Sequence, residues 1–384
     1  MRGSIIKRYK GSYTIVLNLG TDPQTGKRRQ QWISVKGTRK DAERKLAELL
    51  HQLDTGTFMK PGKTTLGQFL EQWLKDYVCN LGPKTAESYE HIIHRHLIPF
   101  LGAITLTGLK PEHLQKCYSE KLSGGLSAQS VRHCHTVLHT ALQTAIKWGL
   151  LTRNVADAVK LPQVQRHEIQ TWNEDEIHQF LDAARDMPNY ALFYLALFTG
   201  ARRNELLALR WCDIDFILSQ IYMTRTLHHL NTGEIVFTQP KSARSRRTIA
   251  LSPSAILMLQ DHKEKQKVTR AMMGIPVKDD DLVFSHLDGS PLLPGSVTHA
   301  WIKLVRRTAL KPIRLHDARH THASLMLKQG IHPKVVQERL GHASIQITLD
   351  TYSHVAPGLQ EAAAKRFDEL VNHKPENEAV ENFG

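Results

Sequence analysis

Cysteine is scarce in this sequence of 384 residues, and long apolar runs are absent. Cys79, Cys117, Cys134 and Cys212 are too few and too scattered for a disulfide framework or a CxxC zinc site, so we expect reduced thiols packed as small apolar groups. The longest apolar run, Tyr190–Phe198, is far shorter than the roughly 20 residues that span a bilayer. A secretory signal pattern is lacking because basic residues follow Ile5 and Ile6 at once. These absences predict a cytoplasmic protein without a membrane partner.

Acidic residues are outnumbered: the sequence has 51 Lys and Arg but only 37 Asp and Glu, which gives a net charge of +14. Such an excess favours a polyanionic partner, although it also aids solubility. The excess is uneven: residues 1–63 carry 14 basic and 5 acidic residues, residues 64–170 carry 11 and 8, and residues 171–384 carry 26 and 24. Most of the unbalanced charge therefore lies in the first sixth of the chain.

Length and pattern predict a multidomain α+β protein of three domains. Residues 1–63 alternate as strands at 12–19 and 31–35, with a helix after the capping pattern of Thr38 and Asp41, and predict a small three-stranded sheet plus one helix. Residues 64–165 have helical periodicity throughout and predict four or five helices. Residues 170–384 predict a mainly helical domain with a small sheet, a hairpin around 231–233, and a C-terminal helix and tail.

Two stretches of the third domain combine residues suited to a phosphate. Arg202, in Thr199–Glu205, follows the buried apolar run and precedes an expected helix over 206–211, where a guanidinium and free N–H groups could share an anion. The alternative is an ordinary pair of Arg202 with Glu205 three residues on. Lys241 lies in a basic loop, Pro240–Arg247, before a strand-like segment, and could instead be a solvated charge.

Two later stretches extend this set. His316 and Arg319 lie three apart on one predicted helix face, where an imidazole and a planar fork donor can address one anion. Gly341 is expected to end a helix over 334–340, and His342 follows it directly. Tyr352 comes ten residues later, at the end of a short helix around 345–349, in a polar context that gives it little reason to be core.

In this order the stretches resemble the tyrosine recombinase, or phage integrase, family. The matching patterns are T-G-x-R-x-x-E-L, P-K-x-x-x-S-x-R, L-H-D-x-R-H-T-x-A-S, L-G-H-x-S and the closing T-x-x-x-Y. Family-like phrasing also covers His96–Gly102 and Ala145–Gly149, and residues 1–63 are similar to the arm-binding domain of longer integrases. The resemblance implies that residues 64–165 bind the core site and that residues 170–384 are catalytic.

The resemblance implies Tyr352 as the nucleophile, assisted by Arg202, Lys241, His316, Arg319 and His342. Fixed cations and imidazoles can stabilise the charge on nonbridging phosphate oxygens without a metal, so no cofactor is expected. Free tyrosine has a pKa of about 10, and His316 is the candidate proton acceptor. Lys241 would protonate the departing 5′ oxygen. Glu205 is expected to hold an arginine of the site. A covalent phosphotyrosine would keep the bond energy for rejoining, with no need of ATP.

The implied partners are double-stranded DNA, at core and arm attachment sites, and further copies of the chain, assembled as a tetramer on DNA. An excision or directionality factor and a host DNA-bending protein are further expected partners. The expected activity is integration and excision of a phage or integrative conjugative element. The residues expected to contact DNA are basic: Lys7, Arg8, Lys10, Lys27, Arg28, Arg29, Arg132, Arg244 and Arg246.

Four alternatives remain at this point. The 22 histidines invite a zinc site, but none fits H-E-x-x-H or has partners at recognised spacing. The segment 335–352 resembles a helix-turn-helix, which suits a noncatalytic DNA-binding regulator but leaves Arg202, Lys241 and the His316–Arg319 pair without a shared task. A type IB topoisomerase would use similar chemistry. A host chromosome-dimer resolving recombinase would resemble this chain without residues 1–63.

Overall fold

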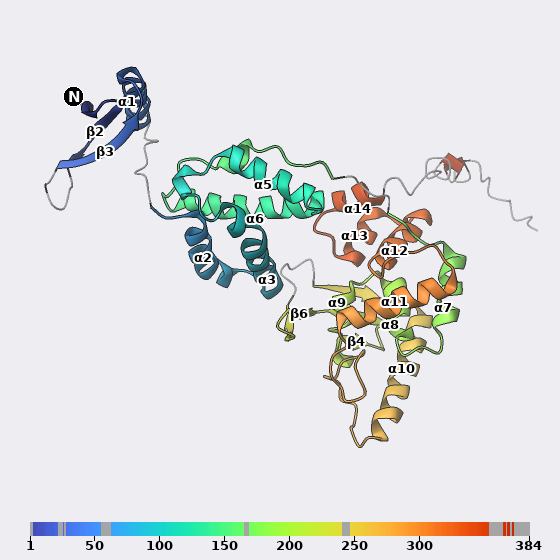
Figure 1. Ribbon diagram of the computed structural model, residues 1–384. Helices are drawn as coiled ribbons and strands as arrows, with labels where there is room; N and C mark the ends of the chain where they lie inside the picture. The colour runs from blue at the N-terminus through green and yellow to red at the C-terminus, as the bar shows by residue number, and fades with distance from the viewer. Residues whose placement is uncertain are drawn as a thin grey trace, which may run out of the picture. The chain divides into compact units, whose positions relative to one another are not determined.

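The computed structural model describes residues 3–21, 26, 28–54, 63–164, 169–239, 246–352, 364, 365, 367, 368 and 371. By its internal contacts the chain divides into two compact units, residues 1–166 and 167–384 (Figure 1). The first unit holds two separate hydrophobic clusters, one in its sheet and one in its helices. The fold is α+β, as the sequence predicts. None of the helices in these ranges combines the length and apolar character needed to cross a bilayer.

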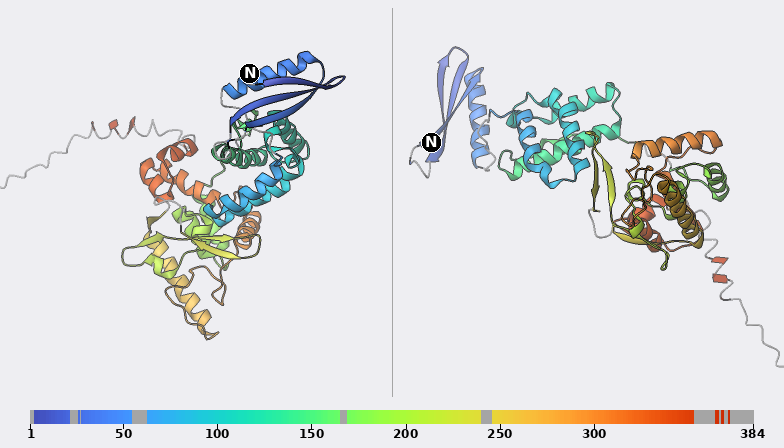
Figure 2. Two further views of the ribbon diagram at one scale, coloured as in Figure 1. Left: turned by 90° about the vertical axis from the view of Figure 1, so that its left-hand side faces the viewer. Right: turned by 90° about the horizontal axis from the view of Figure 1, so that it is seen from below.

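The chain begins with a three-stranded antiparallel sheet in the order β1-β2-β3, formed by β1 (Gly3–Tyr9), β2 (Ser12–Thr21) and β3 (Arg28–Lys36). Helix α1 (Arg39–Asp54) covers one face of this sheet (Figure 2). The predicted capping pattern is confirmed, because Asp41 accepts from the Thr38 backbone N–H at 3.0 Å and Thr38 accepts from that of Asp41 at 3.3 Å. Ile15, Leu17 and Leu49 form the small core.

The helical part of the first unit contains five α-helices within the described residues, as predicted. They are α2 (Leu66–Tyr77), α3 (Pro83–Ile92), α4 (Ile98–Leu101), α5 (Pro111–Ser123) and α6 (Ala128–Lys147). A π-helical turn, η2 (Ile93–Leu97), joins α3 to α4. Short 3-10 turns occupy Val78–Asn80, Leu106–Gly108 and Val155–Ala158. Apolar side chains at helical spacing fill the core, with Trp73 and Leu70 fully buried.

The cysteines divide by exposure. Cys117 and Cys134 are buried and free, as expected for small apolar groups, and burial raises the pKa of the Cys117 thiol to about 11. Cys79 and Cys212 are free but exposed, so the expectation of packed thiols is wrong for these two.

The second unit packs helices around two small sheets. Its elements are α7 (Glu174–Ala184), α8 (Tyr190–Thr199), α9 (Arg203–Leu206), β4 (Ile214–Asp215), β5 (Gln220–Met223), β6 (Thr226–His229), β7 (Ile235–Thr238), β8 (Arg247–Ala250), α10 (Pro253–Ala271), α11 (Pro294–Thr308), α12 (Asp317–Lys328), α13 (Pro333–Leu340) and α14 (Ile345–Tyr352). A 3-10 turn, Trp211–Asp213, precedes β4. The sheets have the orders β4-β5-β8 and β6-β7, and the β6–β7 pair is the predicted hairpin around 231–233.

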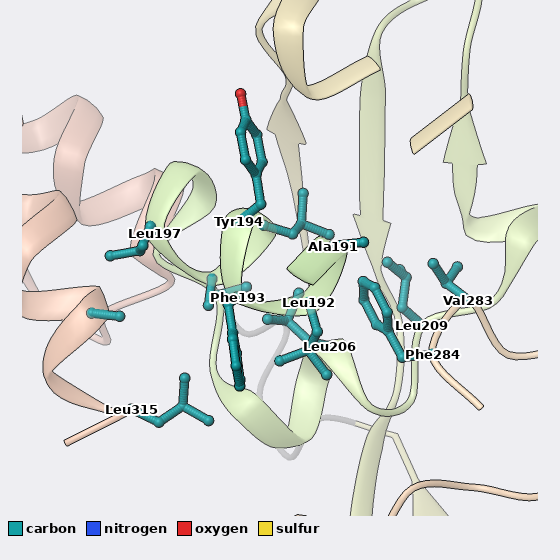
Figure 3. Close-up of a cluster of buried hydrophobic side chains, with 14 of the residues drawn as sticks. Ala191, Leu192, Phe193, Tyr194, Leu197, Leu206, Leu209, Val283, Phe284 and Leu315 are labelled. Atoms are coloured by element: carbon teal, nitrogen blue, oxygen red, sulfur yellow. The ribbon is translucent and has the colours of Figure 1, made fainter. Parts of the chain in front are cut away.

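Helix α8 lies in the centre of the second unit. Its side chains are apolar on every side, which is typical of a helix buried within a core. Figure 3 shows Phe193 and Tyr194 leaving α8 in different directions. Phe193 is packed near Phe180 and Trp301. Because α8 is held by the core, it fixes the position of the segment that follows it.

The helix expected over residues 206–211 is wrong. Helix α9 covers only Arg203–Leu206; a turn follows at residues 207 and 208, and Arg210 then pairs with Leu282 in an isolated antiparallel bridge. The backbone N–H of Trp211 donates to Asp281 O at 3.1 Å, and that of Val283 donates to Leu209 O at 2.9 Å. These long-range bonds, and not further helical ones, satisfy the backbone of Leu209 and Trp211, whose side chains are buried.

The expected C-terminal helix and tail fall largely outside the described residues. Residues 364, 365, 367, 368 and 371 are helical.

Candidate active site

Arg202 is placed by a sharp turn at the end of α8. Gly200 ends the helix at φ +63°, and a Cβ there would lie 2.6 Å from Leu340 Cδ2, so the close approach requires glycine. Arg202 then precedes α9, donates from Nη1 to Glu205 Oε1 at 2.8 Å and from Nη2 to Gly341 O at 3.4 Å, and stays partly exposed. The guanidinium therefore has fixed partners on one side and an open side toward solvent.

Glu205 is the buried acceptor of this region. Its side chain is 4% exposed, and Arg247 donates to both of its oxygens, at 3.1 and 2.9 Å. Burial alone would raise the pKa of Glu205, but the hydrogen bonds and charges of Arg247 and Arg202 lower it to about 2. The expectation that Glu205 holds an arginine is confirmed, and it holds two.

Arg319 is buried on α12, with 4% of its surface exposed. Its Nη1 donates to Gly200 O at 2.8 Å, and its Nη2 donates to Leu340 O at 2.6 Å. His316 immediately precedes the same helix. Desolvation and the charge of Arg319 hold the pKa of His316 below its ordinary value, so the imidazole is neutral at pH 7 and able to accept a proton.

His342 follows the left-handed Gly341 that ends α13, as the sequence predicts. Its Nδ1 lies 2.9 Å from Thr348 Oγ1 on α14, which fixes the ring. Burial lowers the pKa of His342 to about 4, and the charges of Arg319 and Arg202 contribute to the shift. Both arginines bind the backbone directly before His342, at Leu340 O and Gly341 O, so His342 lies near both of them.

The structure thus brings Arg202, His316, Arg319 and His342 together from three separate parts of the second unit. Tyr352 is the last residue of α14, a helix that packs against α12 and α13. Its backbone is described and its side chain is not. Lys241 lies outside the described residues.

Three further residues belong to this region, although the sequence pattern assigns none of them a role in the site: Arg247, His322 and Arg339. Arg247 closes the matched pattern P-K-x-x-x-S-x-R, and in β8 it lies on the same face as Ile249, the buried residue of that strand. This two-residue spacing is a usable signal for an inward-pointing cation. His322 and Arg339 gave no comparable signal, because they meet only in the fold, where Arg339 Nε donates to His322 Nε2 at 3.0 Å.

The residues expected to bind DNA are spread along the chain. Lys7, Arg8, Lys10, Arg28 and Arg246 are exposed, and the Arg8 guanidinium lies 5.9 Å from the centre of the Trp32 ring. Arg132 is exposed and donates to Pro162 O at 3.2 Å. Lys27 and Arg244 lie outside the described residues, and the side chain of Arg29 is not described. Their contact with DNA stays a prediction.

The histidines considered for zinc have other partners. His135 Nδ1 lies 3.2 Å from Tyr118 Oη, His139 Nε2 lies 2.8 Å from Asp157, and His94 Nε2 lies 2.9 Å from Glu71. Across the described ranges, no three His, Cys, Asp or Glu side chains gather in a way that could hold a metal ion.

Comparison with known proteins gives consistent results over most of the chain. The phage integrase family matches residues 170–358, and the phage integrase N-terminal SAM-like domain matches residues 65–122. The ICEBs1 integrase of Bacillus subtilis is 29% identical over 96% of this chain and 100% of its own length.

Two groups of solved structures share the fold. A structure of the Tn1549 transposon integrase bound to circular intermediate DNA has a TM-score of 0.69, with 19% identity over 80% of this chain and 100% of its own. A lambda integrase tetramer bound to a Holliday junction has a TM-score of 0.55, with 21% identity over 88% of this chain and 95% of its own. The motifs, the fold and these matches agree: the chain belongs to the phage integrase family and is a tyrosine recombinase.

Proposed function

We propose that this protein is the integrase of a phage or integrative conjugative element, which cuts and rejoins attachment-site DNA through Tyr352. The observation that carries the proposal is the convergence of Arg202, His316, Arg319 and His342 beside the helix that ends at Tyr352. A noncatalytic regulator has no use for such a cluster. The full-length match to an integrase named for its element supports the same choice over a chromosome-dimer resolving recombinase.

The proposed reaction begins with attack of Tyr352 Oη on the scissile phosphorus. His316 accepts the phenol proton, a bond forms from Oη to phosphorus, and the bond from phosphorus to the 5′ oxygen breaks. Lys241 donates the proton that makes the departing oxygen a hydroxyl. Arg202, Arg319 and His342 stabilise the nonbridging oxygens by fixed hydrogen bonds. The product is a 3′-phosphotyrosine, which a 5′ hydroxyl of a second strand attacks to rejoin the DNA.

The cations of the site are oriented before DNA arrives. Arg319 is fixed by two carbonyl oxygens and Arg202 by Glu205, so little reorganisation is needed when charge develops on the phosphate. The lowered pKa of His316 and of His342 leaves both imidazoles neutral at pH 7, and a bound phosphate would raise these values. We propose that substrate binding itself tunes the protonation of the site.

The assembly and the domain roles are part of the proposal. Residues 1–63 would bind arm sites, residues 64–165 would bind the core site, and residues 170–384 would perform the chemistry. The lambda integrase structure that resembles this chain is a tetramer on a Holliday junction, which supports a tetramer on DNA here. An excision factor and a host DNA-bending protein would control direction, in the cytoplasm where the DNA lies.

The test is a covalent adduct. DNA trapped by the protein in its host is sequenced to obtain the site, and a nicked duplex of that site is incubated with purified protein. We expect a denaturant-resistant protein–DNA adduct with the wild type and with Tyr222→Phe, a control on β5, and none with Tyr352→Phe. Absence of any wild-type adduct, or a full yield from Tyr352→Phe, would contradict the proposal.

A further inference from the structure

The carboxyl end of α13 holds arginines from three separate segments. Arg247 Nε donates to Arg339 O at 2.7 Å, and Arg319 Nη2 donates to Leu340 O at 2.6 Å. Arg202 Nη2 donates to Gly341 O at 3.4 Å. Three successive carbonyl oxygens thus accept from β8, from α12 and from the residue before α9.

Helix geometry explains why the arginines meet there. The last carbonyls of a helix have no partner within it and carry the negative end of its dipole, which favours cations. Gly341 stops α13 in the left-handed region at φ +68°, and its N–H closes on Gln337 O and Glu338 O. The carbonyls of residues 339–341 are left to bind guanidinium groups from other segments.

Arg247 differs from the other two arginines in burial and in partners. Its side chain is 5% exposed, and its three nitrogens bond to Glu205 and Arg339 O. It also packs against Gly341, where an added Cβ would lie 3.0 Å from its Cδ. Each nitrogen of the Arg247 guanidinium is thus engaged with a group of the protein itself.

The partners of Arg247 are the groups that hold the phosphate-binding residues. Glu205 binds Arg202, and the end of α13 binds Arg319 and leads into His342. We infer that Arg247 is a positioning residue of the recombination reaction: it joins Glu205 to the end of α13 and so sets Arg202, Arg319 and His342 around one phosphate. The inference rests on the proposed function of that site.

A matched control exists in the same unit. Arg270 on α10 is 4% exposed and donates from Nη1 to Asp281 Oδ2 at 2.9 Å, so it too is a buried arginine paired with a carboxylate. This ion pair joins α10 to the segment before Leu282 and involves none of the residues of the candidate site. Loss of either arginine removes a buried ion pair, but only loss of Arg247 releases the end of α13.

The experiment compares Arg247→Met, Arg247→Lys and Arg270→Met in the full chain. Thermal unfolding is followed by circular dichroism, and adduct formation is measured in single turnover with saturating nicked duplex, well below each midpoint. We expect both methionine variants to lose stability. Arg247→Met should form adduct about 100-fold more slowly, as expected for misplaced groups, with affinity for the duplex little changed. Arg270→Met should stay within about threefold of wild type, and Arg247→Lys should recover little because lysine lacks the fork.

A second measurement does not depend on activity. Amide hydrogen exchange should speed up at residues 202–206 and 339–343 in Arg247→Met and Arg247→Lys, and stay at the wild-type rate there in Arg270→Met. If Arg247→Met does not fold, the rate of adduct formation and the hydrogen exchange of Arg247→Lys decide the question. Wild-type rates of adduct formation and exchange in a folded Arg247 variant would overturn the inference. Failure of the wild type to form adduct would instead refute the proposed function, and the exchange pattern would still decide whether Arg247 holds these segments.

Discussion

Two groups of basic residues in this protein have opposite surroundings. Near the amino terminus, Lys7, Lys10 and Arg28 are exposed on strands or a turn of a small sheet. In the second unit, Arg247 and Arg319 are about 5% exposed and bound to a carboxylate or to backbone carbonyls. Exposed cations attract DNA over a distance that salt screens, whereas buried ones provide fixed directions that salt hardly affects. On the proposed function, the exposed cations would hold DNA, and the buried ones would orient the groups that cut it.

The largest effect expected from this contrast is at Arg319. Arg319→Lys cannot bond Gly200 O and Leu340 O together and also face a phosphate, so single-turnover cleavage should fall by about 100- to 1000-fold. The salt dependence of DNA binding should stay as in the wild type. A rate within about tenfold of wild type would place Arg319 outside the chemistry.

The exposed group should behave in the opposite way. Replacing Lys7, Lys10 and Arg28 with Gln should weaken binding of DNA that carries arm sites and flatten its salt dependence, by about one unit of log–log slope for each phosphate that is no longer neutralised. Cleavage by the preformed complex should not change. The matched control replaces Arg39, Arg44 and Lys45, which pair with Glu43, Asp41 and Glu48 on α1. An equal loss of slope in the control would show that general charge, and not these strands, is responsible.

Two glycine variants distinguish the role of the end of α13 from the general cost of placing a side chain on a left-handed backbone. Gly341→Ala meets both a left-handed backbone and Arg247, whereas Gly274→Ala meets a similar φ of +72° with no atom within 4 Å of the new Cβ. Both should lose about 1 kcal/mol of unfolding free energy from the backbone term. Gly341→Ala should in addition slow cleavage by roughly tenfold, because it displaces carbonyls that hold the arginines. Equal rates in the two variants would mean that the end of α13 tolerates displacement.

The last contrast concerns stability alone and His322, whose ring is fixed between Leu197 O and the Arg339 guanidinium. Burial and the charge of Arg339 lower the pKa of His322 to about 3. Between pH 6.5 and about pH 3, the His322 imidazole binds a proton in the unfolded chain but not in the folded chain. The free energy of unfolding therefore falls as the pH falls. The slope is about 1.4 kcal/mol per pH unit for one such group.

His322→Gln should therefore flatten the fall in unfolding free energy between pH 6.5 and pH 4, measured by urea denaturation. His133→Gln, a change at an exposed histidine on α6, is the control and should keep the wild-type slope. A slope unchanged in His322→Gln would mean that other groups account for the acid sensitivity.

The sequence predicted the fold class, the capping pattern of Thr38 and Asp41, the glycine that ends α13 and the four side chains that converge at the site. Each of these leaves a local pattern or a known motif. The bounds of α9 could not be predicted, because the backbone of Leu209 and Trp211 bonds to residues 279–283, which are distant in the chain. Nor could the role of Arg247, since its partners Glu205 and Arg339 are 42 and 92 residues away in the chain.

The most direct test of the account is the identity of the residue that joins DNA. The adduct formed by the wild-type protein on its trapped site is digested with nuclease and protease, and the peptide that retains a nucleotide is sequenced by mass spectrometry. The account predicts a single modified peptide in which Tyr352 carries a 3′-phosphonucleotide. A nucleotide on any other side chain, or linkage through a 5′ phosphate, would contradict it.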